Sequence, residues 1–247
     1  MVEEARPLNN ENLPVEMRAH WYNAVCFDPD DPWKDFEPSS AAVVLVDLIN
    51  WQAHPDGASI QALRDGGSTA EADYIVGQCK SQLLPTLSQV LDAARSIGIR
   101  VIHARLAGET SAYDNVVLAM KPYVGAAAAV DGTWGAEVLE GLEAAGDLSV
   151  VKGGSGAFST SDLHHVLQQH GIRTVLYAGV VTNACVMLTA AAGYDLGYRQ
   201  YLLTDCTAAL SERDHADAVR FMDAFIAQGV TGSEAILAFQ TVGRRSI

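Results

Sequence analysis

Short apolar runs alternate with longer amphipathic stretches along this chain. Apolar runs of about four to eight residues, rich in Val, Ile and Leu, are typical of strands that are buried on both faces. The longer stretches repeat their apolar residues at spacings of three and four, as helices with one buried side do. We expect strands at 41–47, 99–104, 148–151, 173–180 and 198–204, with a sixth at 234–239. We expect helices over 69–96, which Pro85 divides or kinks, and over 161–170, 183–196 and 211–228.

Strands that alternate with helices predict a parallel sheet, because the connection between two parallel strands has to cross back over the sheet. We therefore predict an α/β fold of three layers, with a doubly wound, mostly parallel six-stranded sheet and helices on both faces. Residues 41–247 are expected to form this single domain. Residues 1–40 are polar and rich in proline but also carry several aromatic side chains. Disordered segments seldom do so, and we expect an arm that packs on the domain or on a neighbouring subunit.

Three of the predicted strands are followed by side chains that can take part in catalysis. Asp47 closes the first strand, Lys152 closes the third, and Cys185 follows the fourth in the first turn of a helix that Thr182 or Asn183 can cap. Each has an ordinary alternative, as a turn-forming acid, a solvated lysine or a packed thiol. However, the carboxyl ends of parallel strands share the sheet edge where such folds bind ligands. A helix start also biases a thiol toward thiolate. The sequence therefore predicts an acid, an amine and a nucleophilic sulfur around one cavity.

The segments around these residues resemble the isochorismatase-like cysteine hydrolases, the superfamily of nicotinamidases, N-carbamoylsarcosine amidase, biuret hydrolase and ureidoacrylate amidohydrolase. The most specific block is Gly-Val-Val-Thr-Asn-Ala-Cys-Val at 179–186. The other matching segments are 46–50, 132–135, 152–158 and 205–208. The resemblance implies the isochorismatase-like hydrolase fold and a catalytic triad of Asp47, Lys152 and Cys185. It also implies a cis peptide bond between Val180 and Val181.

The resemblance implies a reaction as well. Asp47, held near Lys152, takes the thiol proton, and the thiolate of Cys185 attacks an amide or ureido carbonyl to form a thioester. The backbone N–H groups of Val181 and Cys185 form the oxyanion hole. Ammonia or an amine leaves, and water then hydrolyses the thioester. The implied substrate is a small amide or ureido compound, no cofactor is needed, and a homodimer or homotetramer is expected.

Five side chains are candidates for the walls of the substrate pocket. Gln52 and Glu109 could hydrogen-bond a terminal amide, and Arg105 would suit a carboxylate. Trp134 and Phe158 could provide aromatic walls, although core positions are as good an interpretation for both.

Composition and charge narrow the range of partners. The formal net charge is −14, from 30 acidic and 16 basic residues. Such a surface repels nucleic-acid phosphate and anionic membranes, so we expect neither as a partner. No apolar run approaches the ~20 residues that span a bilayer. The polar, acidic start of the chain does not predict a secretory signal, and the four cysteines are widely spaced. We therefore expect a cytoplasmic protein without a disulfide scaffold.

Other chemistries fit the sequence less well. Metal-dependent nicotinamidases carry an Asp-x-His with a further His, which the segment 103–109 lacks, so no catalytic metal is expected. Gly154-x-Gly156 is not a dinucleotide motif, because Ser159 stands where the third glycine would be. Two alternatives to amide hydrolysis remain: isochorismatase-type ether hydrolysis, and a non-catalytic member that binds a ligand in the same pocket.

Overall fold

A six-stranded parallel sheet forms the centre of the computed structural model, which describes residues 26–28 and 31–245. The strand order is β3-β2-β1-β4-β5-β6, and every neighbouring pair is parallel. The strands are β1 (Ala41–Val46), β2 (Arg100–Leu106), β3 (Leu148–Lys152), β4 (Thr174–Val180), β5 (Arg199–Ala208) and β6 (Gln228–Val230). The predicted α/β fold with a parallel six-stranded sheet is confirmed.

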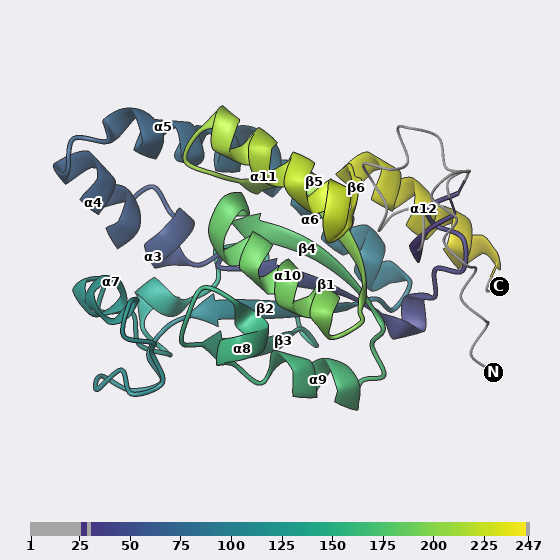
Figure 1. Ribbon diagram of the computed structural model, residues 1–247, viewed down its shortest axis with the longest axis horizontal. Helices are drawn as coiled ribbons and strands as arrows, with labels where there is room; N and C mark the ends of the chain where they lie inside the picture. The colour runs from purple at the N-terminus through teal and green to yellow at the C-terminus, as the bar shows by residue number, and fades with distance from the viewer. Residues whose placement is uncertain (1–25, 29–30, 246–247) are drawn as a thin grey trace.

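Helices cover both faces of the sheet (Figure 1). One face carries α5 (Thr69–Gln78), α6 (Leu84–Ser96) and α12 (Gly232–Arg245). The other carries α8 (Ala157–Thr160), α9 (Leu163–Gln169), α10 (Met187–Asp195) and α11 (Glu212–Phe225). The shorter elements are η1 (Pro38–Ser40), α3 (Asn50–Ala53), α4 (Ala58–Asp65), η2 (Cys79–Leu83), α7 (Lys121–Ala126), η3 (Trp134–Ala136) and η4 (Thr182–Val186). Of these, η2 and η4 are single π-helical turns.

The central strand β1 contributes to both hydrophobic cores. Val43 and Leu45 pack with the α5, α6 and α12 side, whereas Val44 and Val46 pack with the α8 to α11 side. Successive side chains of a strand point to opposite faces, so a strand covered on both sides has to be apolar at every position. All six residues of β1 are buried, which explains why it appears in the sequence as an uninterrupted apolar run.

The expected sixth strand at 234–239 is wrong, because this segment lies within α12. Its buried residues Ala235, Ala238 and Phe239 recur at spacings of three and four, which is the pattern of a helix face. The sixth strand is instead the three-residue β6, at the end of what was predicted as a longer helix. A strand of three residues is too short to display a period, so the sequence pattern did not reveal it.

The described part of the N-terminal arm packs on β5 of its own domain. Trp33 stacks on Tyr201 with ring centroids 4.4 Å apart, and the hydroxyl of Tyr201 donates to the carbonyl of Pro32 at 2.6 Å. Arg199 donates to the carbonyls of Pro32 and Lys34 at 3.0 and 2.9 Å. Residues 1–25 of the predicted arm lie outside the described residues. In the described ranges, no helix has the length and hydrophobicity to cross a membrane.

Candidate active site

The carboxyl edge of the sheet brings together the three reactive side chains that the sequence singled out. Asp47 directly follows β1, Lys152 ends β3, and Cys185 lies in η4 just after β4. The Nζ atom of Lys152 lies 2.8 Å from Oδ2 of Asp47, and both side chains are completely buried. Cys185 is 6% exposed and feels the charges of both groups. A carboxylate, an ammonium and a thiol therefore share one dry site.

Asp47 leaves β1 in a conformation that separates the roles of its two oxygens. Its φ of 55° is left-handed, which aspartate tolerates better than most residues. Oδ1 accepts a hydrogen bond of 2.8 Å from the backbone N–H of Leu106. Oδ2 lies 2.8 Å from the ammonium of Lys152, and the carboxylate also accepts a hydrogen bond from the thiol of Cys185. One oxygen is thus anchored to β2, while the carboxylate as a whole meets both the ammonium and the thiol.

The glycine-rich turn after β3 holds the ammonium of Lys152. Nζ donates to the carbonyl oxygens of Gly154 and Ser155 at 2.8 and 3.0 Å. Together with the ion pair to Asp47, these contacts use all three N–H groups of the ammonium. The cation is consequently held in one position beside the thiol.

Gly179 allows β4 to approach β1 closely enough to form the site. Its φ is 128°, and a Cβ atom built there would lie only 2.0 Å from the carbonyl oxygen of Val46. Only glycine fits such an approach. The close contact brings η4, with Cys185, alongside Asp47 at the end of β1. Just after Gly179, the peptide bond between Val180 and Val181 is cis.

The thiol of Cys185 does not behave as its position at a helix start predicts. Burial raises its pKa to about 12, and the negative charge of Asp47 acts in the same direction. The ammonium of Lys152 and the hydroxyl of Ser155 act against this rise without cancelling it. The expected bias toward thiolate is therefore wrong, because the thiol is buried and lies beside a carboxylate.

Thr189 and His215, neither of which the sequence pattern marks, hold η4, the turn that carries Cys185, in place. The hydroxyl of Thr189 donates to the carbonyl of Cys185 at 2.6 Å and accepts from the N–H of Ala157 at 3.1 Å, which ties η4 to α8. Thr182 does not cap the helix as expected, since its hydroxyl lies 3.0 Å from Nδ1 of His215 on α11. The only sequence signal for Thr189 is its place four residues after Cys185. No local signal links Thr182 to His215, because the contact forms only in the folded chain.

Of the five predicted pocket residues, Gln52 has the most informative position. Its Nε2 atom is buried without a hydrogen-bond partner among the described residues. Buried donors without partners are rare, and a bound ligand is one of the few ways to satisfy them. Phe158 lies in the same apolar cluster as Cys185 and stacks on Tyr198 with ring centroids 5.4 Å apart.

The other three predicted pocket residues are less suited to binding a substrate. Arg105 is already engaged, with Nε donating to the hydroxyl of Ser149 at 2.7 Å and Nη1 lying 2.8 Å from Asp131. Trp134 is half exposed and meets the ring of His54 edge-on. Glu109 is exposed at the surface of its loop. In the part of the chain that is described, no group of three His, Cys, Asp or Glu side chains could hold a metal ion.

Comparisons with known sequences agree with the resemblance. The family model described as "Isochorismatase domain" matches residues 76–234. Ureidoacrylate amidohydrolase RutB of Agrobacterium fabrum is 25% identical over 186 residues, which cover 69% of this chain and 77% of the relative. The uncharacterized isochorismatase family protein YwoC of Bacillus subtilis is 36% identical over 89 residues, which cover 36% of this chain and about half (47%) of YwoC.

Solved structures share the fold. A cysteine hydrolase from Pseudomonas syringae superimposes with a TM-score of 0.69 at 22% identity, covering 83% of this chain and 95% of that structure. N-carbamoylsarcosine amidase from Thermoplasma acidophilum gives a TM-score of 0.58 at 22% identity and covers 78% of this chain and 96% of that structure. At these identities the two superpositions establish the fold alone.

Proposed function

This chain belongs to the isochorismatase family, and on that premise we propose that it is a hydrolase that cleaves a C–N bond in a small amide or ureido compound. The observation that carries the proposal is the buried cluster of Asp47, Lys152 and Cys185. The names of two similar proteins, a ureidoacrylate amidohydrolase and an N-carbamoylsarcosine amidase, support this substrate class.

The first half of the proposed reaction forms a thioester. Oδ2 of Asp47 takes the proton of the Cys185 thiol while the sulfur attacks the carbonyl carbon of the substrate. The negative charge that develops on the carbonyl oxygen is stabilised by the N–H groups of Val181 and Cys185, at roughly 3–4 kcal/mol per donor. In support of this role, the N–H of Val181 donates no hydrogen bond to any described residue.

The second half releases the products. Asp47 returns the proton to the departing nitrogen as the C–N bond breaks, so ammonia or an amine leaves and the acyl group stays on sulfur. Water then attacks the thioester with Asp47 as base, and the thiol is restored. Lys152 faces an anion throughout, because the negative charge moves between the carboxylate, the sulfur and the carbonyl oxygen.

The high pKa of Cys185 is consistent with this sequence of steps. A thiol with a pKa of about 12 stays protonated at neutral pH, so attack and proton transfer have to occur together once a carbonyl is in place. A substrate carbonyl near the unpaired Nε2 of Gln52 would satisfy that buried donor, and Phe158 would form an apolar wall. We propose Gln52 and Phe158 as the substrate contacts on these grounds.

The test is ammonia or amine release from a panel of small amides and ureido compounds. Wild type and Cys79→Ala are expected to turn over at least one compound, because Cys79 is a buried thiol outside the cluster, in η2. Cys185→Ala is expected to be inactive. Rapid acid quench and intact-mass measurement should trap an acyl adduct on the Cys185 peptide of the wild type. Turnover by Cys185→Ala, or an adduct elsewhere, would contradict the mechanism.

The two alternatives predict different results in the same experiment. Isochorismatase-type ether hydrolysis would release pyruvate instead of ammonia. A non-catalytic binding protein would turn over nothing and would bind its ligand equally well in wild type and Cys185→Ala. We further propose, from the sequence alone, a cytoplasmic homodimer or homotetramer, which light scattering of the purified protein would test.

A further inference from the structure

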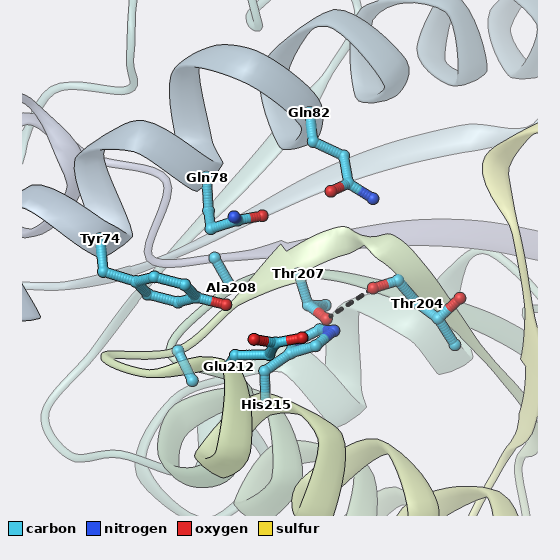
Figure 2. A pocket seen from close by; sticks show the side chains of 9 residues that line it. Tyr74, Gln78, Gln82, Thr204, Thr207, Ala208, Glu212 and His215 are labelled. Atoms are coloured by element: carbon cyan, nitrogen blue, oxygen red, sulfur yellow. Dashed lines mark hydrogen bonds between the residues drawn. The ribbon is translucent and has the colours of Figure 1, made fainter.

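A polar hollow lies on the same edge of the sheet, one strand beyond β4. It is a cavity of about 360 Å³ at the carboxyl end of β5, and none of the three cluster residues lines it. Tyr74, Gln78 and Gln82 approach it from α5 and η2, and Glu212 and His215 approach it from the start of α11 (Figure 2). The volume is at the lower end of the range for small-molecule sites, which suits a ligand of a few heavy atoms.

A bulge in β5 opens this hollow. Tyr177 of β4 pairs with Leu202 of β5, and the next pair is Gly179 with Thr207. β5 therefore contains extra residues over this stretch. Thr204 and Thr207 of the bulged stretch line the cavity, with the hydroxyl of Thr207 donating to the carbonyl of Thr204 at 3.4 Å (Figure 2) and the hydroxyl of Thr204 donating to the carbonyl of Val230 at 3.2 Å. Bulges of this kind commonly lie beside functional sites, because they redirect side chains without ending the strand.

Three polar side chains around the cavity are free to bind a ligand. Gln78, Gln82 and Glu212 line it, reach its solvent-accessible space and have no side-chain hydrogen bond or ion pair within the described ranges. Burial and, to a lesser degree, the charge of Glu212 raise the pKa of Tyr74, which agrees with a carboxylate that faces the phenol. His215 uses Nδ1 for Thr182 and keeps Nε2 for another partner. One carboxylate and several neutral groups that can accept hydrogen bonds therefore surround this space.

The charge of the lining limits what could bind. No lysine or arginine lines the cavity, and Glu212 is its carboxylate. The amide oxygens of Gln78 and Gln82 and the hydroxyls of β5 add further acceptors. An anion would be repelled by Glu212, and the lining has no lysine or arginine to offset this. A cation with several N–H groups would pair with Glu212 and donate hydrogen bonds to the neutral acceptors around it.

We propose that this cavity is a binding site for a small organic cation with several N–H donors, of the alkylguanidinium or alkylammonium type. The site does not depend on the proposed reaction, because it contains none of the residues assigned to it. It nevertheless adjoins the nucleophile turn, since His215 holds Thr182 at the first position of η4. An occupant that contacts His215 is therefore expected to change the reactivity of Cys185.

The experiment is a calorimetric titration of the full-length protein with methylguanidinium chloride and with ethylammonium chloride, each compared with sodium acetate and acetamide at equal ionic strength. Saturable binding of at least one of the two cations is expected, with no binding of acetate. Glu212→Gln keeps the shape of the side chain and removes its charge, and it should weaken binding roughly tenfold. Gln78→Leu should also weaken binding.

The matched control is Glu140→Gln, which removes an exposed carboxylate outside the cavity and should bind like the wild type. Both glutamates are exposed, so neither substitution is expected to affect folding, and thermal unfolding would verify this. The proposal is overturned if neither cation saturates the wild type, if Glu212→Gln binds as tightly as Glu140→Gln, or if acetate binds equally well. The link to the nucleophile is overturned if cation binding leaves the alkylation rate of Cys185 unchanged.

Discussion

Asp47 and Asp147 both have buried side chains. They lie at opposite ends of the sheet, and their carboxylates have very different partners. Asp147 immediately precedes β3 and accepts from Arg95 at 2.6 and 3.2 Å and from the N–H of Ala144 at 3.0 Å, with Nε2 of His103 at 3.1 Å. Asp47 faces the other end of β3. Its carboxylate accepts from the N–H of Leu106 and from the thiol of Cys185, and it pairs with the ammonium of Lys152.

The difference separates a structural carboxylate from one that can exchange a proton. Burial alone raises the pKa of Asp147, but hydrogen bonds from Arg95 and His103 outweigh it, so the pKa is lowered overall. Such a group stays ionised and stabilises the fold. Asp47 instead shares its site with the ammonium of Lys152 and with the thiol of Cys185, which hydrogen-bonds to it and carries a proton. The partners of a buried carboxylate are therefore a better marker of chemistry here than burial itself.

The largest expected effect is on turnover when each aspartate is replaced by asparagine. Asp47→Asn removes the proton acceptor of the proposed reaction, and kcat on the substrate found in the panel should fall by about 10²–10⁴-fold. Asp147→Asn should keep most of its kcat, because its cluster does not touch the thiol. A steady-state assay of both proteins measures this. Equal losses of kcat would show that the two carboxylates do not differ in role.

The second expected effect concerns the alkylation of Cys185 as a function of pH. With a pKa of about 12, the rate with iodoacetamide should rise close to tenfold per pH unit from pH 7 to pH 10 without a plateau. The site-specific rate can be followed by mass spectrometry of the Cys185 peptide. A plateau near pH 8 would mean that the pKa of the thiol is not raised. The description of Cys185 as a buried thiol beside a carboxylate would then be wrong.

The third effect is on stability, through the buried ion pair. Lys152→Met leaves the carboxylate of Asp47 without a cation and should lower the free energy of unfolding by about 3–5 kcal/mol. The double variant Asp47→Asn/Lys152→Met should recover part of this loss but no activity. Urea unfolding of the two single variants and the double variant measures the coupling. If the losses of unfolding free energy in the two single variants add up to the loss in the double variant, the pair contributes no interaction energy.

The smallest expected effect is on the pH dependence of the stability that Asp147 provides. A carboxyl group with a lowered pKa in the folded state stabilises the protein above its unfolded pKa of about 4, and this contribution is lost as the pH falls through the folded value. Asp147→Asn should therefore be less stable than wild type by about 1.5–3 kcal/mol at pH 6. The difference should shrink toward pH 3 in urea unfolding curves. A difference that is independent of pH would mean that the charge of Asp147 does not matter.

Local sequence was sufficient for the frame of the molecule and for the three reactive positions. The apolar run of β1 reflects a strand that is covered on both faces, and this requirement acts at every position of the run. Asp47 directly follows a strand, Lys152 ends one and Cys185 lies in the turn after another, so the topology of parallel strands alone predicts that they share an edge. The same reasoning failed at 234–239, where six residues of sequence did not distinguish a strand from part of a helix.

Only the tertiary structure decided how these groups interact. The pKa of Cys185 depends on burial by elements far apart in sequence and on a carboxylate 138 positions away, so the local helix start did not predict its direction. The sequence does not indicate a partner for Arg105, whereas in the fold its guanidinium contacts Ser149 and Asp131. The contact of His215 with Thr182 likewise joins two separate elements. Desolvation and pairing are properties of the assembled chain, and for this reason they appear only once distant segments have packed together.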